Sequence, residues 1–112
     1  MGIEITWTVA SIDEARKVSR YLVQERLVAK AEITPWVESV LLLNNQLETT
    51  QETKVTFKAV EENLNAIEEI IKKNSRYEIP EISWRKIEGA NVEYQEWLTG
   101  ATKDEGGRRK GE

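Results

Sequence analysis

Residues 3–18, IEITWTVASIDEARKV, join a strand pattern to the start of a helix. Over residues 3–9 apolar side chains alternate with Glu and Thr, and this period of two is typical of a half-buried strand. Ser11 and Glu14 then match a capping box, in which the Ser hydroxyl accepts a hydrogen bond from a free backbone amide and the Glu side chain reaches back. The stretch therefore predicts a strand followed by a helix that begins at Ser11 and ends near Leu27.

Residues 29–59 are rich in β-forming side chains and predict a long hairpin. Because Pro35 cannot donate to a ladder, residues 29–43 form either an edge strand or two strand segments that meet at a bend around Pro35 and Trp36, and we expect the bend. Asn44-Asn45-Gln46 predicts the hairpin turn, since asparagine tolerates positive φ. Strand alternation resumes over residues 51–59.

The second half of the chain predicts a helix, a strand and a short helix. Apolar residues at helical spacing predict a helix over residues 60–74, with an acidic start and a basic end that suit the helix dipole. Residues 82–87 predict the last strand, and residues 91–98 predict the short helix. This order predicts an α+β fold of the ferredoxin-like βαββαβ type, an antiparallel sheet with two helices on one face plus a short C-terminal helix.

One domain is expected over residues 1–100, because a chain of 112 residues can bury a single core. The segment that follows ends in TKDEGGRRKGE, which is charged, rich in glycine and free of large apolar side chains. Such a segment cannot offset its ordering entropy, so we expect residues 101–112 to be a disordered tail.

The composition argues against several classes of function. Lys and Arg number 16 against 20 Asp and Glu, and the two signs are interspersed, so we expect no nucleic-acid interface. Cys and His are absent, which removes the commonest transition-metal ligands and the commonest general base. We find no leader-like segment and no apolar run of about 18 residues, and therefore expect a cytoplasmic protein that does not enter a membrane.

Two helices can cover only one face of a four-stranded sheet, and the chain has more apolar side chains than this arrangement hides. We expect the open face and the long hairpin to be buried between copies of the chain. The side chains concerned are Trp36, Val40, Leu41, Leu42, Leu43 and Trp84.

Four separated segments resemble the CutA family of divalent-cation tolerance proteins. ASIDEARKVSRYLVQERL is similar to the family's first helix, and ERLVAKAEITPWVESV to its ERLAACVNIIP-like segment that leads into a strand. RYEIPEIS is similar to the HPYEVPEI signature, and NVEYQEWL to the closing NxxYLxWL, so the resemblance covers residues 3–99. It implies a ferredoxin-like homotrimer joined through the long hairpins, an architecture shared with PII signalling proteins, and an association with tolerance of copper and other divalent ions.

The sequence departs from the family at the side chains that would bind copper. Lys30 stands where the family often has Cys, and Ser75 stands where HPYE has His. Leu41 and Leu42 replace the aromatic pair typical of the family's third strand. Since carboxylates alone favour hard cations such as calcium, magnesium or manganese, we expect any copper binding to be weak.

The segment RYEIPEIS has two interpretations. In the structural one, Pro80 sets an extended approach to the last strand and Tyr77 packs on the end of the preceding helix. In the functional one, which the resemblance supports, Glu78 and Glu81 line a cleft between subunits and hold a divalent cation. The side chains that would complete this cleft or ligand site are Trp36, Lys58, Tyr77 and Pro80.

The leading interpretation is a small, trimeric, non-enzymatic CutA-like protein associated with divalent-ion tolerance, with no certain cofactor. An enzyme is not expected, because Glu78 and Glu81 would point to opposite faces of an extended segment. A PII-like trimer that binds a small anionic ligand at the subunit cleft is a first alternative, and Lys30 or Lys58 pointing into the cleft would favour it. A structural interaction scaffold is a second alternative.

Overall fold

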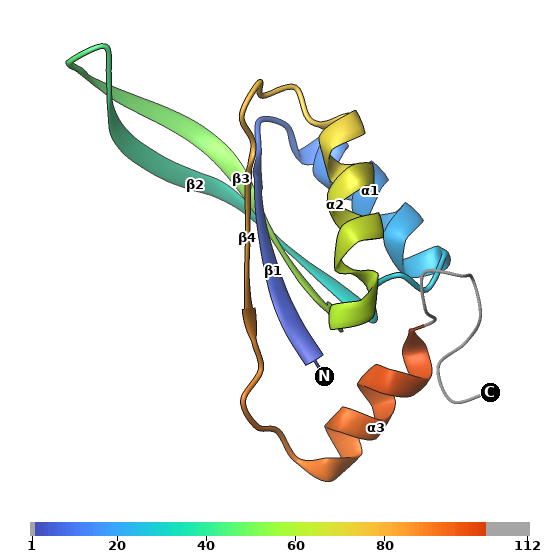
Figure 1. Cartoon of the computed structure of the whole chain (residues 1–112). Coiled ribbons are helices and arrows are strands. Elements are labelled where there is room, and N and C mark those ends of the chain that lie inside the picture. The colour runs from blue at the N-terminus through green and yellow to red at the C-terminus, as the bar shows by residue number, and fades with distance from the viewer. Residues whose placement is uncertain (1, 103–112) are drawn as a thin grey trace.

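The computed structural model describes residues 2–102. Its elements are β1 (Gly2–Val9), α1 (Ile12–Gln24), β2 (Lys30–Leu43), β3 (Gln46–Val60), a 3-10 turn η1 (Glu61–Asn63), α2 (Leu64–Asn74), β4 (Glu81–Lys86) and α3 (Val92–Ala101). The strands form one antiparallel sheet in the order β2-β3-β1-β4, with α1 and α2 side by side on one face (Figure 1). The predicted ferredoxin-like arrangement and its extra C-terminal helix are confirmed.

The core lies between the sheet and the two helices. On β1 the apolar residues Ile3, Ile5, Trp7 and Val9 are fully buried, while the polar residues between them are only partly covered. The strand alternation read from the sequence is thus the alternation between the helix-covered face and the open face. The core positions that pack against β1 are Ala15, Val18 and Leu22 on α1, Val55, Phe57 and Ala59 on β3, and Ile67 and Ile71 on α2.

The capping box at the start of α1 is half formed. The Ser11 hydroxyl accepts hydrogen bonds from the amides of Asp13 and Glu14 at 3.1 and 3.2 Å, which satisfies two of the free donors of the first turn. The Glu14 carboxylate lies 3.4 Å from Nε of Arg76 instead of reaching back to Ser11. Glu14 therefore ties α1 to the segment that leads into β4.

The end of α1 differs from the prediction. The helix stops at Gln24 and not near Leu27, because Arg26 adopts a left-handed conformation with φ 62°. The amide of Leu27 then donates to the carbonyl of Leu22 at 3.0 Å, which closes the helix in a Schellman turn. The end of the helix was not predicted, because this left-handed position is occupied by Arg and not by Gly.

β2 is one edge strand with a bulge, so the edge alternative holds and the expected bend between two segments is wrong. The register with β3 shifts between Thr34 and Val37, and Trp36 adopts φ 64°. Pro35 lies inside the bulge, where its missing amide costs no ladder hydrogen bond.

The hairpin tip is confirmed. Asn44 and Asn45 have φ 53° and 65°, the two positive values that a tight hairpin turn requires. β3 starts directly after them at Gln46, five residues before the predicted strand start at Gln51. The hairpin projects as a two-stranded arm beyond the rest of the sheet (Figure 1).

The C-terminal boundaries shift by a few residues. The helix predicted over residues 60–74 begins with η1, and β4 starts at Glu81, one residue before its predicted start. α3 continues to Ala101, and Thr102 is fully buried, with Oγ1 donating to the carbonyl of Leu98 at 3.2 Å. The ordered domain therefore includes residues 101 and 102, which were predicted to belong to the tail. The rest of the predicted tail lies outside the described residues.

The open face of the sheet is polar, which corrects the expectation of an apolar open face. We call this the polar face, and its residues are Glu4, Thr6 and Thr8 on β1, Lys30, Glu32 and Thr34 on β2, Lys54, Thr56 and Lys58 on β3, and Glu81, Ser83 and Arg85 on β4. Trp84 pairs with Ile5, so it belongs to the helix-covered side, at the edge of the sheet, where it is 48% exposed.

The exposed apolar surface lies on the hairpin arm. Its side chains are Val40, Leu41, Leu42, Leu43 and Leu47, which are 43–71% exposed. Successive residues of a strand point to opposite faces, so both faces of the arm are apolar. Within residues 2–102 no helix is long and apolar enough to cross a membrane.

Candidate functional site

Tyr77 fastens the RYEIPEIS segment to the base of the hairpin arm. Its hydroxyl donates to Oε2 of Glu52 at 2.7 Å, and Glu52 lies opposite Val37, next to the bulge in β2. Burial, reinforced by the hydrogen bond to Glu52, raises the pKa of Tyr77 to about 12. The phenol therefore stays protonated at neutral pH and acts as a hydrogen-bond donor. Tyr77 was expected to pack on the helix end, and its bond to β3 was not foreseen.

Trp36 lies beside the same glutamate. The positive φ at Trp36 turns its side chain outward, and the indole is 75% exposed. Trp36, Pro35 and Glu52 line a small depression of about 120 Å³. Glu52 thus links two residues of the predicted cleft, Trp36 and Tyr77, although the depression in a single copy is too small to enclose a metabolite.

Glu78 and Glu81, the predicted cation ligands, have different surroundings. The Glu81 carboxylate already accepts hydrogen bonds from the hydroxyls of Thr8 and Ser83, at 2.7 and 3.2 Å. Glu78 is exposed, and Pro80 directly precedes β4, as the structural interpretation requires. Among the described residues, no group of three or more acidic side chains could hold a metal ion. Cation binding by Glu78 and Glu81 therefore remains a prediction.

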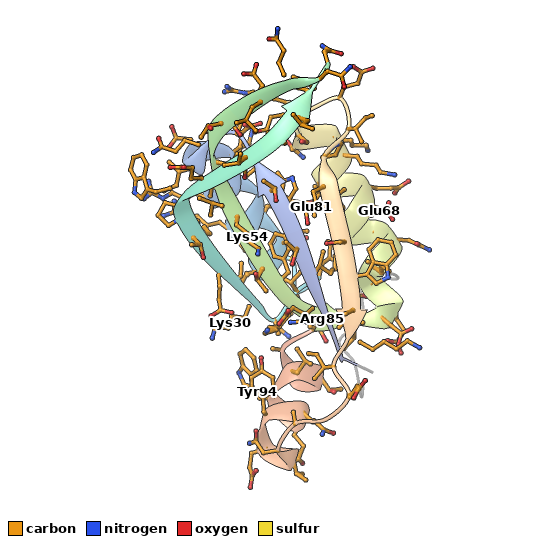
Figure 2. All side chains as sticks on the ribbon, turned by 90° about the vertical axis from the view of Figure 1, so that its left-hand side faces the viewer. Lys30, Lys54, Glu68, Glu81, Arg85 and Tyr94 are labelled. Atoms are coloured by element: carbon orange, nitrogen blue, oxygen red, sulfur yellow. The ribbon has the colours of Figure 1, made fainter. Side chains whose placement is uncertain are left out.

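Lys58 lies away from the other predicted site residues. It is on the polar face opposite Glu4, with which it forms an ion pair, whereas Glu81 lies opposite Thr8 farther along β1. Figure 2 looks onto this face, with Lys54 in the middle of the sheet and Arg85 and Glu81 on β4.

Glu4 joins β3 to β4 across the polar face. Arg85 donates to Oε1 of Glu4 from Nε and Nη2 at 3.2 and 3.0 Å, while Lys58 binds Oε2. The hydrogen bond from Lys58, together with Arg85 and against the effect of burial, holds the pKa of Glu4 below its ordinary value. Glu4 and Arg85 were not predicted as partners from the sequence. The alternation of residues 3–9 placed Glu4 on the wet face, but the register with β4 is not encoded locally.

The model of the CutA1 divalent ion tolerance protein family matches residues 3–101. The chain belongs to the CutA1 family.

Proteins named CutA are similar to this chain in sequence, and a solved CutA structure is similar to it in fold. The rice "Protein CutA 1, chloroplastic" is 31% identical over 103 residues, which are 92% of this chain and 58% of the rice protein. The "Divalent-cation tolerance protein CutA" of Thermus thermophilus is 32% identical over 91 residues, 81% of this chain and 88% of that protein. The solved structure of Cut A1 from Thermus thermophilus matches with a TM-score of 0.85 at 30% identity and covers 91% of this chain and 99% of that one. The chain thus spans little more than half the length of its rice relative.

The two positions that depart from the expected CutA1 pattern offer no soft metal ligand. Lys30 is on the polar face, where its Nζ lies 3.7 Å from Glu32. Ser75 caps the end of α2, and its buried hydroxyl has no hydrogen-bond partner among the described residues. Lys30 and Lys58, the cations that would favour an anion in the cleft, both lie in ion pairs on the polar face.

Replacing Tyr77 with Phe should lower the free energy of unfolding by about 1 kcal/mol, because the bond to Glu52 is lost while the ring stays. The pKa of Tyr77 is raised by folding, so its stabilising effect is complete below the unfolded value of 10.0 and is lost as the pH rises towards about 12. Urea unfolding of both proteins at pH 8 and pH 11 measures this difference.

Tyr21→Phe is the matched control, since Tyr21 is half exposed on α1. It should leave the stability within about 0.5 kcal/mol of the wild type. An equal loss in both variants at pH 8 would contradict a stabilising role of the Tyr77 hydroxyl.

Replacing Glu4 with Gln should cost about 1–2 kcal/mol, because Lys58, with a side chain only 19% exposed, loses its charged partner. The pKa of Glu4 is lowered by folding, so its contribution is present above the unfolded value of 4.5 and is lost as the pH falls through the lower folded value. Urea unfolding at pH 7 and pH 3 should show a larger difference at pH 7 than at pH 3.

Glu69→Gln makes the same change of charge on an exposed position of α2 and is the control. It should have little effect at either pH. A penalty for Glu4→Gln that is undiminished at pH 3 would mean that the glutamate acts through its shape and not through its charge.

Proposed function

We propose that this chain is a cytoplasmic, non-enzymatic protein of divalent-ion tolerance that works as a homotrimer joined through the β2–β3 hairpins. Membership of the CutA1 family supports the role in ion tolerance. The main support for the assembly is the exposure of the apolar side chains of the hairpin arm, which are 43–71% exposed and lie on both of its faces. Monomeric proteins rarely leave such a continuous apolar surface in water, and burial against further copies removes it.

The proposal of a non-enzymatic protein rests on the titratable groups. Glu4, Tyr77 and Glu93 are three groups whose pKa values depart clearly from the ordinary ones. Glu4 is held in ion pairs on the polar face, Tyr77 is bonded to Glu52, and Glu93 is fully exposed on α3. An acid and base pair requires two groups with divergent environments in one pocket, and these three lie in different places.

The proposed cation site uses Glu78 and Glu81 from more than one copy. Glu78 makes no ion pair with any residue of the described part, so its carboxylate is available to a ligand. Because the donors are carboxylate oxygens, the site should prefer a hard cation such as Mn²⁺ and bind Cu²⁺ weakly.

Calorimetric titration of the full chain with MnCl₂ and with CuCl₂ tests this proposal, with the oligomeric mass measured on the same sample. We expect saturable heat with Mn²⁺ that Glu78→Gln/Glu81→Gln reduces at least tenfold in affinity, about 1.4 kcal/mol. Glu69→Gln/Glu96→Gln changes the net charge equally on α2 and α3 and should leave the binding unchanged. If the protein is a trimer but neither ion gives heat, the cation site is wrong and the structural scaffold is the function that remains. If the protein is a monomer, the proposed assembly is wrong.

A further inference from the structure

The polar face contains one cation that no described residue neutralises. Lys54 lies between Thr8 and Thr34 in the register of the sheet, and among residues 2–102 its side chain has no ion pair and no hydrogen bond. Lysine in a strand of this kind usually meets a carboxylate on a neighbouring strand. Lys54 instead faces hydroxyl side chains and is exposed in the middle of the sheet (Figure 2).

The carboxylates around Lys54 are already occupied by other donors. Glu4 binds Lys58 and Arg85, Glu32 binds Lys30, and Glu81 accepts from Thr8 and Ser83. Glu52, which precedes Lys54 on the same side of β3, accepts from Tyr77. The carboxylates near Lys54 therefore already have other donors, and the ammonium group of Lys54 has no carboxylate partner among the described residues.

An open depression of about 330 Å³ lies between Lys54 and Arg85. The hydroxyls of Thr56, Thr6 and Ser83 form a row across it, because Thr6 pairs with Thr56 on β3 and with Ser83 on β4. Lys54 and Arg85 flank this row from opposite ends. A bound group would thus meet hydroxyls beneath it and a cation on either side, beside Glu4, which also lines the depression.

Arg85 keeps donors for a ligand even though it binds Glu4. It uses Nε and Nη2 for the Glu4 carboxylate, and a guanidinium has five N–H donors, so the Nη1 donors remain. Its side chain is 80% exposed, so it can turn these donors towards the depression. Glu4 does not repel a bound anion strongly, because two cations already share its charge.

From these contacts we infer that the depression between Lys54 and Arg85 binds a phosphoryl group, either as inorganic phosphate or as part of a small phosphate ester. A tetrahedral oxyanion presents several acceptor oxygens in different directions, which suits two flanking cations and a row of hydroxyls better than a planar carboxylate does. The volume exceeds that of bare phosphate, so a small ester also fits. This inference does not use the proposed cation, and the exposure of Lys54 on which it rests is that of a single copy.

Calorimetric titration of the full chain with sodium phosphate, and separately with glycerol phosphate, tests this inference. The buffer is metal-free and has a fixed ionic strength, because salt screens exposed charges. We expect saturable heat at millimolar ligand, and Lys54→Gln should weaken the binding about 10- to 100-fold, since it removes a charge-assisted hydrogen bond. Tighter binding of glycerol phosphate would identify the ester as the source, and equal or weaker binding would identify the free ion.

Two matched controls separate a built site from general charge attraction. Lys73→Gln makes the same charge change on α2, on the helix side of the sheet, and should leave the affinity unchanged. Thr6→Val should weaken binding severalfold, whereas Thr34→Val, on the polar face but outside the depression, should not. No saturable binding of either ligand, or an equal loss with Lys73→Gln, would overturn the inference.

Discussion

A variant with Leu42→Glu and Leu47→Lys should be a folded monomer, whereas the wild type should have three times the chain mass of 12.9 kDa. Leu42 and Leu47 are directly opposite each other in the hairpin arm and are 69% and 71% exposed. Burying two such leucines contributes roughly 3–6 kcal/mol per copy, so their loss should weaken assembly at least a hundredfold.

The design of this pair keeps the arm itself intact. Opposite charges on directly paired residues stabilise a hairpin, and a Glu with a Lys leaves the net charge of the chain unchanged. Both positions lie outside the core cluster, so the protomer should retain its secondary structure. Light scattering coupled to size exclusion measures the mass, and circular dichroism checks the fold.

Val92→Glu is the control for the hairpin variant. Val92 is a similarly exposed apolar residue, 66% accessible, but it lies on α3, away from the arm. A charge there should leave the mass unchanged. A double variant that keeps the wild-type mass, or a wild type that is monomeric at micromolar concentration, would exclude the hairpin as the interface.

The elements that the sequence predicted well are those with local causes. The alternation in residues 3–9 depends only on the period of the strand, and the Asn44 and Asn45 turn depends only on backbone preferences. The resemblance of four segments then selected the topology, and the strand order β2-β3-β1-β4 agrees with it.

The errors have a common cause, since each depends on contacts between distant segments. Pro35 and Trp36 were expected to break the strand, but pairing with β3 on either side of the bulge holds β2 together as one strand. Thr102 was expected in the tail because its neighbours are charged, yet its hydroxyl binds the end of α3 and its side chain is buried.

The contacts of the candidate site residues within one copy were predicted less well than the fold. The sequence grouped Lys58 with Trp36 and Tyr77, but the register of β3 places Lys58 next to Glu4 on the polar face. Likewise Lys54 was not singled out, because an unpaired lysine is recognisable only when the partners of its neighbours are known. Side-chain partners across a sheet depend on the register between the strands. Alternation shows which face a side chain is on, but a shift of the register by two or four residues keeps the same alternation and changes every partner.

Replacing Trp7 with Ala should have the largest effect on the protomer. Trp7 is fully buried in the middle of β1, and its ring stacks on Phe57 with centroids 6.4 Å apart. Truncating a buried aromatic side chain costs about 3–5 kcal/mol, a large part of the 5–15 kcal/mol that stabilises a typical domain. Thermal unfolding at a fixed protein concentration should show a loss of roughly 12–40 °C.

Trp7→Phe distinguishes the volume of this side chain from its polar group. The indole Nε1 is buried with no hydrogen-bond partner among residues 2–102, and an unpaired donor of this kind costs about 1–3 kcal/mol. Phe removes that donor and keeps an aromatic ring against Phe57, so the gain should offset much of the lost volume, and the net cost should be below about 2 kcal/mol. Trp97→Ala is the control for an exposed tryptophan. Trp97 is 46% exposed on α3, so this change should cost less than Trp7→Ala. If Trp7→Phe were as damaging as Trp7→Ala, the indole N–H would have to stabilise the fold through a bond, and the buried donor could not be a cost.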